Sequence, residues 1–171
     1  VAYFIEPIIA NHDLKQFEIF CYSNVLKPDK TTKRLRSYPV KWRETRHMND
    51  KVLLKQIIDD KINIFIDLMG HTADNRLSIL ASKPAPIQIT YLGYPNTIGL
   101  SSVDYRIVDK ITDTKNDGHY HTESLARLSG CFLCYKPSED APLIKDIPME
   151  NYGHITFGTF NNLAKITQEV V

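Results

Sequence analysis

The chain has 171 residues, of which 43% are hydrophobic and 24% charged, and its 21 basic side chains nearly balance 20 acidic ones. This size and composition are typical of a globular domain with its own core, and the balanced charge argues against a nucleic-acid groove or an anionic membrane surface as partner. No apolar run approaches the roughly 18 to 20 residues that span a bilayer. Val1 begins inside an amphipathic pattern and Val171 ends abruptly, which predicts that the chain is part of a longer protein.

Helical and strand patterns alternate along the chain. In order, we predict a helix over residues 3–10, a strand over 17–22, a solvated basic loop over 27–36, a helix that starts at Asn49 or Asp50, and a strand over 63–68. A short helix over 74–82 follows, and then strands over 87–91, 104–108, 132–135 and 155–160. One apolar face is expected on the helix that starts at Asn49 or Asp50, formed by Val52, Leu53, Ile57 and Ile58. The alternation predicts an α/β fold with a mostly parallel, doubly wound, Rossmann-like sheet.

The proline-rich segment 136–148 is typical of a linker. We therefore predict a first domain over residues 1–136, a linker over 137–150, and the first strand and turn of a second domain over 151–171. The odd number of cysteines, three, favours a reducing compartment over a disulfide framework. Cys131 and Cys134 form a CxxC, but on a strand they would point to opposite faces, so we expect core packing rather than a metal site.

Two strand ends carry polar groups suited to a ligand. The stretch from Ala85 to Asp109 is predicted to form a strand, a compact loop and a second strand, and the loop offers Tyr94, Asn96 and Thr97. Loops at the ends of parallel strands are where open α/β sheets bind ligands, so this loop suits a sugar or a phosphate. The other strand end is the turn Gly70-His71-Thr72, where the imidazole could act as a general base or donate to an anion, or be an ordinary loop histidine.

A third candidate follows the last predicted strand. There Asn161 and Asn162 form a polar turn, and Lys165 comes one helical turn later, a position from which a lysine can hold a diphosphate as a point charge. From the pattern alone, Lys165 is equally compatible with an ordinary surface lysine. The sequence lacks GxGxxG, GxxxxGK[ST], GxSxG, DxD and HExxH motifs, so we expect no nicotinamide or flavin cofactor and no catalytic metal.

Several segments, in the same order, resemble the catalytic region of O-GlcNAc transferases and SPINDLY-like proteins, and of these PAPIQITYLGYPNTIGL is the most specific. The others are YFIEPIIANHD, FEIFCYSN, IDLMGHTADNRL, DYRIVD, GCFLCYKP and ITFGTFNNLAKIT. The similarity is closer to the bacterial and plant branch, which carries GHTA and FNNLAK, than to the animal enzymes. It runs over nearly the whole chain.

The resemblance implies two Rossmann-like halves of the GT-B type, of which this chain is the amino-terminal one. It implies an inverting, metal-independent transfer of a sugar from UDP-GlcNAc, or from GDP-fucose in SPINDLY-like members, to Ser or Thr of a protein. It also implies acceptor proteins held by upstream tetratricopeptide repeats, and a cytoplasmic or nuclear location.

Carried onto this sequence, the resemblance places Leu92, Gly93 and Pro95 against the donor sugar. Asn162 and Lys165 match positions that contact the diphosphate. Gly70, His71 and Thr72 match a turn that faces the cleft, where His71 is expected to bind before it acts as a base.

Two departures from the family pattern bear on activity. A histidine expected in the family just before Val1 is not in this chain, so the catalytic base is expected upstream. Many relatives also have a histidine where this chain has Lys41, directly before Trp42. We therefore expect the fragment to be inactive alone. The alternatives are a non-catalytic module that binds a nucleotide-sugar or a protein, and a generic Rossmann-like cofactor binder that would not depend on the LGYP loop.

Overall fold

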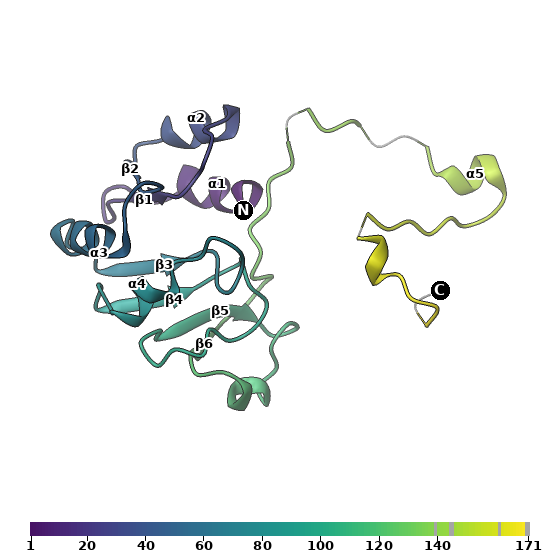
Figure 1. Cartoon of the computed structure of the whole chain (residues 1–171). Coiled ribbons are helices and arrows are strands. Elements are labelled where there is room, and N and C mark those ends of the chain that lie inside the picture. Colours follow the sequence, from purple (N-terminus) through teal and green to yellow (C-terminus); the bar gives the residue numbers. More distant parts are fainter. Residues whose placement is uncertain (139, 144–145, 161, 170–171) are drawn as a thin grey trace. The chain divides into compact units, whose positions relative to one another are not determined.

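The computed structural model describes residues 1–138, 140–143, 146–160 and 162–169, and these fall into two compact units, Val1–Pro137 and Ser138–Val171 (Figure 1). The first unit holds five-residue to ten-residue helices and short strands in alternation: α1 (Ala2–Ala10), β1 (Phe20–Ser23), α2 (Lys30–Arg36), β2 (Lys41–Glu44), α3 (Asp50–Asp59), β3 (Ile64–Asp67), α4 (Leu77–Ala81), β4 (Ile87–Thr90), β5 (Tyr105–Asp109), a 3-10 turn η1 (Asp117–Tyr120) and β6 (Ser124–Leu128). The second unit holds α5 (Pro148–Tyr152) and a 3-10 turn η2 (Leu163–Lys165).

Every strand pair in the described residues is parallel. β1 pairs with β2 in one sheet, and β3, β4, β5 and β6 lie side by side in that order in another. Because neighbouring strands run the same way, the carboxyl ends of all four strands meet at one edge of the larger sheet (Figure 1). The predicted parallel α/β fold is confirmed.

Two small apolar clusters lie on one side of the larger sheet. Leu53 and Ile57 of α3 pack with Ile79 of α4, and Leu80 of α4 packs with Ile98 and Val103 of the loop between β4 and β5. Phe65 of β3 contacts both clusters, so α3 and α4 cover the same face of β3. On the strand positions that alternate with this face, four large apolar side chains remain between 38% and 46% exposed: Ile64, Ile66, Ile87 and Tyr105. Parallel sheets are usually covered on both faces, so this second face is more exposed than is typical of a parallel sheet.

The structure confirms where α3 begins and corrects its apolar face. The Asn49 side chain accepts a hydrogen bond from the Val52 amide at 3.0 Å, which is the expected N-cap. Leu53 and Ile57 are buried, whereas Val52 and Ile58 are 51% and 53% exposed. Residues four apart share one face of a helix, and each neighbour is turned by about 100°. Only Leu53 and Ile57 of the four predicted residues therefore face the core.

The basic segment 27–36 was predicted to be a loop, and this prediction is wrong for its last seven residues, which form helix α2. Asp29 caps this helix by accepting the Thr32 amide at 2.8 Å, and the Thr32 hydroxyl faces the Asp29 amide in return at 3.4 Å. This reciprocal arrangement is a capping box. Arg34 then joins α2 to Glu6 of α1 through a salt bridge of 2.6 Å.

The carboxyl-terminal strands differ most from prediction. Residues 132–135 and 155–160 are not strands, and β2 and β6 are strands that the sequence patterns did not indicate. β6 pairs along the whole of β5, so the place beside β5 is taken before residue 132 is reached. Cys131 and Cys134 are both free and exposed rather than in the core, so the argument that placed them on opposite strand faces fails. Among the described residues no group of His, Cys, Asp or Glu is arranged to hold a metal ion.

In the second unit, Asn162 precedes a 3-10 turn rather than a regular helix, and Asn161 lies outside the described residues. The division into a first half, a linker and the start of a second half stays a prediction. None of the described helices has both the length and the apolar character that a membrane crossing needs.

Candidate functional site

The loops that follow β3 and β4 are in close contact at two glycines, Gly70 and Gly93. Gly70 adopts a left-handed φ of +53°, and a Cβ placed there would lie 2.3 Å from the Cβ of Tyr94. A Cβ on Gly93 would lie 1.9 Å from the carbonyl oxygen of Leu68 and 2.6 Å from its carbon. The two backbones therefore touch, because each loop has a glycine where the other approaches.

His71 joins the same two loops through its side chain. Its Nε2 lies 2.9 Å from the carbonyl oxygen of Ile98, and its ring meets the Tyr94 ring edge-on at 5.0 Å between centroids. Because a carbonyl only accepts, Nε2 carries the proton in this contact, and in a neutral ring Nδ1 then has the free lone pair. The described residues record no partner for that Nδ1. His71 can therefore accept a proton or a hydrogen bond from a ligand on its outer side.

The turn that contains His71 is stabilised by the carboxylate of Asp67, the last residue of β3. Its carboxylate accepts the amides of Met69 at 3.1 Å and Gly70 at 2.8 Å, and also the Thr90 hydroxyl at 3.2 Å. Asp67 is only 8% exposed. The Thr72 hydroxyl donates to the Met69 carbonyl at 2.7 Å, so in this turn it closes the loop.

The loop after β4 is held by two buried charged residues. Arg106 of β5, 6% exposed, donates from Nη1 to the carbonyls of Tyr94 at 2.9 Å and Asn96 at 2.7 Å. Glu123, 3% exposed, accepts the Ile98 amide at 2.6 Å and the Thr97 hydroxyl at 2.7 Å. Burial lowers the pKa of Arg106, and the nearby carboxylates of Asp113 and Glu123 oppose that shift. Arg106 and Glu123 thus hold the main chain of this loop at both ends of the segment from Tyr94 to Ile98.

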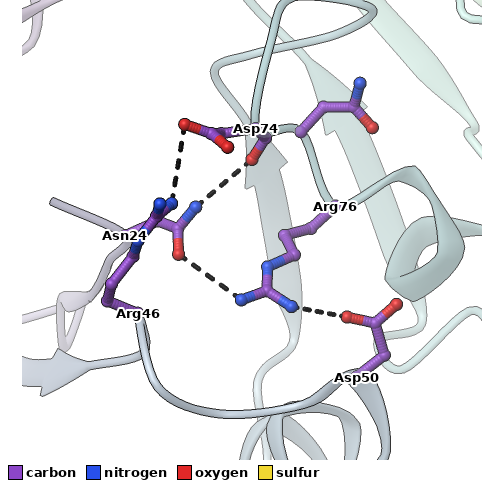
Figure 2. Close-up of a pocket in the computed structure, with 6 residues that line it drawn as sticks. Asn24, Arg46, Asp50, Asp74 and Arg76 are labelled. Carbon is purple, nitrogen blue, oxygen red and sulfur yellow. Dashed lines mark hydrogen bonds and ion pairs between the residues drawn. The ribbon is translucent and has the colours of Figure 1, made fainter. Parts of the chain in front are cut away.

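A polar hollow of about 280 Å³ lies beside these loops and is shown in Figure 2. It is formed by residues that follow β1, β2 and β3: Asn24, Arg46, Asp50, Asp74, Asn75 and Arg76. Arg76 donates to Asp50 at 2.6 Å, to the Met48 carbonyl at 3.1 Å and to Asn24 at 3.4 Å. Arg46 pairs with Asp74 at 3.5 Å. Hydrogen bonds from Ser78 and Arg76 lower the pKa of Asp50. The hollow thus carries two cationic and two anionic side chains that are paired with one another, so its charges balance.

The structure brings together part of the predicted site. Gly70, His71 and Thr72 lie against the loop that contains Leu92, Gly93 and Pro95, so these two strand ends form one surface. Leu92 takes a left-handed φ of +72°, a costly conformation for a residue with a Cβ, and Pro95 is exposed. Asn162 and Lys165 lie in the second unit, where the Asn162 side chain accepts the Ala164 amide at 3.1 Å and Lys165 is exposed. The ligand contacts assigned to all these residues stay predictions.

Arg106, Glu123 and Asp67 were not singled out from the sequence as site residues. An arginine inside the apolar strand sequence DYRIVD is a usable signal, because a cation is rarely buried without acceptors. Glu123 gives no such signal, since it lies in a polar stretch like many surface residues.

Comparison with known proteins identifies the family of the chain. Residues 2–140 match the profile of glycosyl transferase family 41. The chain is 45% identical over its whole length to a probable UDP-N-acetylglucosamine–peptide N-acetylglucosaminyltransferase SPINDLY from Eustoma exaltatum, and 29% identical to the SEC protein of the same description from Arabidopsis thaliana. It covers 19% and 18% of those proteins.

Among solved structures, an O-GlcNAc transferase mutant from Thermobaculum terrenum superposes with a TM-score of 0.78 at 37% identity, over 81% of this chain and 26% of that one. The chain thus spans about a fifth of the length of the curated relatives that it matches, and it shares its fold with the matching part of the Thermobaculum terrenum structure. It belongs to glycosyl transferase family 41.

Proposed function

We propose that the chain is part of an inverting protein O-glycosyltransferase that moves a sugar from a nucleotide diphosphate to Ser or Thr hydroxyls. GlcNAc from UDP-GlcNAc is the first candidate and fucose from GDP-fucose the second. The observation that carries this proposal is the pair of interlocked loops at the carboxyl edge of the sheet. Rigid loops with close backbone approach suit a sugar, and the relatives that match this chain are named as sugar transferases to peptides.

In this proposal the backbone of Leu92 and Gly93 and the ring of Pro95 lie against the donor sugar. His71 contributes Nδ1 as an acceptor for a sugar or acceptor hydroxyl. The catalytic base belongs to a segment of the parent protein upstream of Val1.

Asn162 and Lys165 hold the diphosphate. As the glycosidic bond breaks, charge gathers on the leaving diphosphate, and a lysine placed there stabilises that charge without a metal ion or other cofactor. We expect residues 1–171 alone to be inactive, because they correspond to only about a fifth of the length of the relatives. In the parent protein, tetratricopeptide repeats present the acceptor, and the enzyme works in the cytoplasm.

The test is a transfer assay on the full-length protein with UDP-GlcNAc and GDP-fucose, with and without EDTA. We expect transfer from one of these donors that survives EDTA. Lys165→Ala should lower kcat by about 10²- to 10³-fold, the effect of removing one preorganised group that stabilises developing charge. Lys51→Ala, an exposed lysine on α3, is the matched control and should leave kcat unchanged. Unchanged kinetics of Lys165→Ala, or a strict metal requirement, would contradict the proposal.

A non-catalytic binding module is the second candidate. It is favoured by Lys41, which stands where many relatives have histidine and is paired with Glu18 at 2.6 Å, with its ammonium 5.0 Å from the centre of the Phe20 ring. A full-length protein that binds a nucleotide-sugar but transfers it to no acceptor would select this alternative.

A further inference from the structure

A second hollow, of about 390 Å³, lies at the same carboxyl edge of the sheet, beyond the loops of the candidate site. It is lined by Lys110, which follows β5, by Thr114 and Lys115 of the next loop, and by Arg127 of β6. Because β4, β5 and β6 are consecutive neighbours in the sheet, this hollow and the loop after β4 share one edge. Three of its four lining residues are cations.

The carboxylates near this hollow are engaged with other groups. Asp113 lies 3.1 Å from Nε2 of His121. Asp117 accepts the Thr114 amide at 2.6 Å, and hydrogen bonds to Thr114 are the main reason that its pKa is lowered, with His119 and Arg127 as lesser causes. Two carboxylates thus lie near the hollow, and within the described part of the chain neither is recorded in a salt bridge with Lys110, Lys115 or Arg127.

Arg127 is held by main-chain carbonyls instead of a carboxylate. Its Nε donates to the Asp113 carbonyl at 3.0 Å and its Nη2 to the Thr114 carbonyl at 2.6 Å. Neutral acceptors fix the guanidinium in place without cancelling its charge. For Lys110 and Lys115, both exposed, the described residues record no acidic partner. Lys110, Lys115 and Arg127 are three cations, against the two nearby carboxylates of Asp113 and Asp117. The hollow therefore has an excess of one positive charge, which a bound anion would neutralise.

This charge is local rather than a consequence of composition. The whole chain carries a formal net charge of only +1. Two exposed lysines and an arginine held by main-chain carbonyls offer separate cationic side chains rather than a main-chain cradle for a single phosphate. Three separate cationic side chains can pair with several negative groups along one peptide.

We propose that this basic hollow binds an acidic stretch of the acceptor polypeptide, through carboxylate or phosphoryl groups next to the modified Ser or Thr. The inference rests on the proposed function, since it takes the ligand to be a peptide. The loop that lines the hollow also contacts the loop after β4, because Thr122 and Thr97 lie 3.1 Å apart through their hydroxyls. A peptide that reaches the proposed sugar site can therefore extend along the same edge to the hollow.

The test compares three labelled peptides bound to the full-length protein, followed by fluorescence anisotropy. One peptide carries glutamates beside its serine, one carries phosphoserines in their place, and one carries glutamines. The double variant Lys110→Glu/Lys115→Glu should weaken binding of the two acidic peptides by about tenfold or more at low salt, because two surface charge contacts are reversed. Binding of the glutamine peptide should not change. Lys27→Glu/Lys51→Glu, with the same change in net charge at exposed sites elsewhere, is the control.

Transfer kinetics separate this inference from the proposed function. We expect the double variant to raise KM for the acidic peptides and to leave kcat, and both constants for the glutamine peptide, unchanged. The inference would be overturned, while transfer itself persists, if the double variant weakened binding of all three peptides equally or of none. The same would follow if the control variant weakened binding as much as the double variant. Displacement of the acidic peptides by low concentrations of inorganic phosphate would assign the hollow to a free anion and also overturn it. Charge-dependent binding without transfer from either donor would instead contradict the proposed function alone.

Discussion

Replacing Gly93 by alanine tests the contact between the two loops directly. The added Cβ would lie 1.9 Å from the Leu68 carbonyl oxygen and 3.0 Å from the Met69 Cα, well inside contact distance. These are backbone atoms at the end of a paired strand, so they cannot rotate away as a side-chain end would. Insertion of a methyl group into a packed interior costs about 1–3 kcal/mol, and overlap with backbone places this change at the upper end, about 3 kcal/mol.

Urea unfolding of the 171-residue chain, followed by the fluorescence of Trp42, its only tryptophan, measures this cost. With a urea m-value of about 1–3 kcal/mol per molar, the Gly93→Ala midpoint should fall by roughly 1–3 M. Gly130→Ala is the control, since no atom lies within 4 Å of its added Cβ and its φ lies outside the left-handed region. It should be neutral or more stable by up to about 1 kcal/mol. Equal midpoints for Gly93→Ala and the parent chain would refute the close approach of the two loops.

Three further predictions concern buried charged residues, two that hold the loop after β4 and one, Asp109, at the end of β5. Glu123→Ala should destabilise the chain by about 1–3 kcal/mol, because the Ile98 amide loses its acceptor, and hydrogen exchange of that amide should become faster; unchanged exchange would contradict this role. Arg106→Met removes the donor to the Tyr94 and Asn96 carbonyls and should cost a similar amount, about 1–3 kcal/mol, seen as a lower urea midpoint. Amides of Thr112 and Phe132 lower the pKa of Asp109 from 3.8 to about 2, so its contribution to stability is full above pH 4 and is lost as the pH falls toward 2. Asp109→Asn should flatten that part of the stability profile, and an unchanged acid transition would count against it.

The elements that followed from the sequence are those with local causes. Asn49 has extended backbone and caps α3 through the amide of Val52, three residues later. Runs rich in β-branched residues, such as 87–91, identify strands. The errors arose where the cause was not local. Residues 132–135 have strand composition but no free sheet edge beside β5, because β6 occupies it. The basic segment contains a capping box, an aspartate followed three residues later by a threonine, at Asp29 and Thr32. The many charged residues of the segment led instead to the prediction of a solvated loop.

The sequence by itself determined the alternation of helices and strands, the parallel sheet, and the glycine-containing turns that identify the family. These depend on turn chemistry, hydrophobic spacing and short motifs, all of which act within a few residues. Only the tertiary structure decided which groups meet: His71 and Ile98 are 27 residues apart, and Ile98 and Glu123 are 25 apart. The basic hollow likewise joins Lys110 to Arg127 across two strands. No local pattern carries such contacts, because they exist only after parallel strands have aligned their carboxyl ends at one edge.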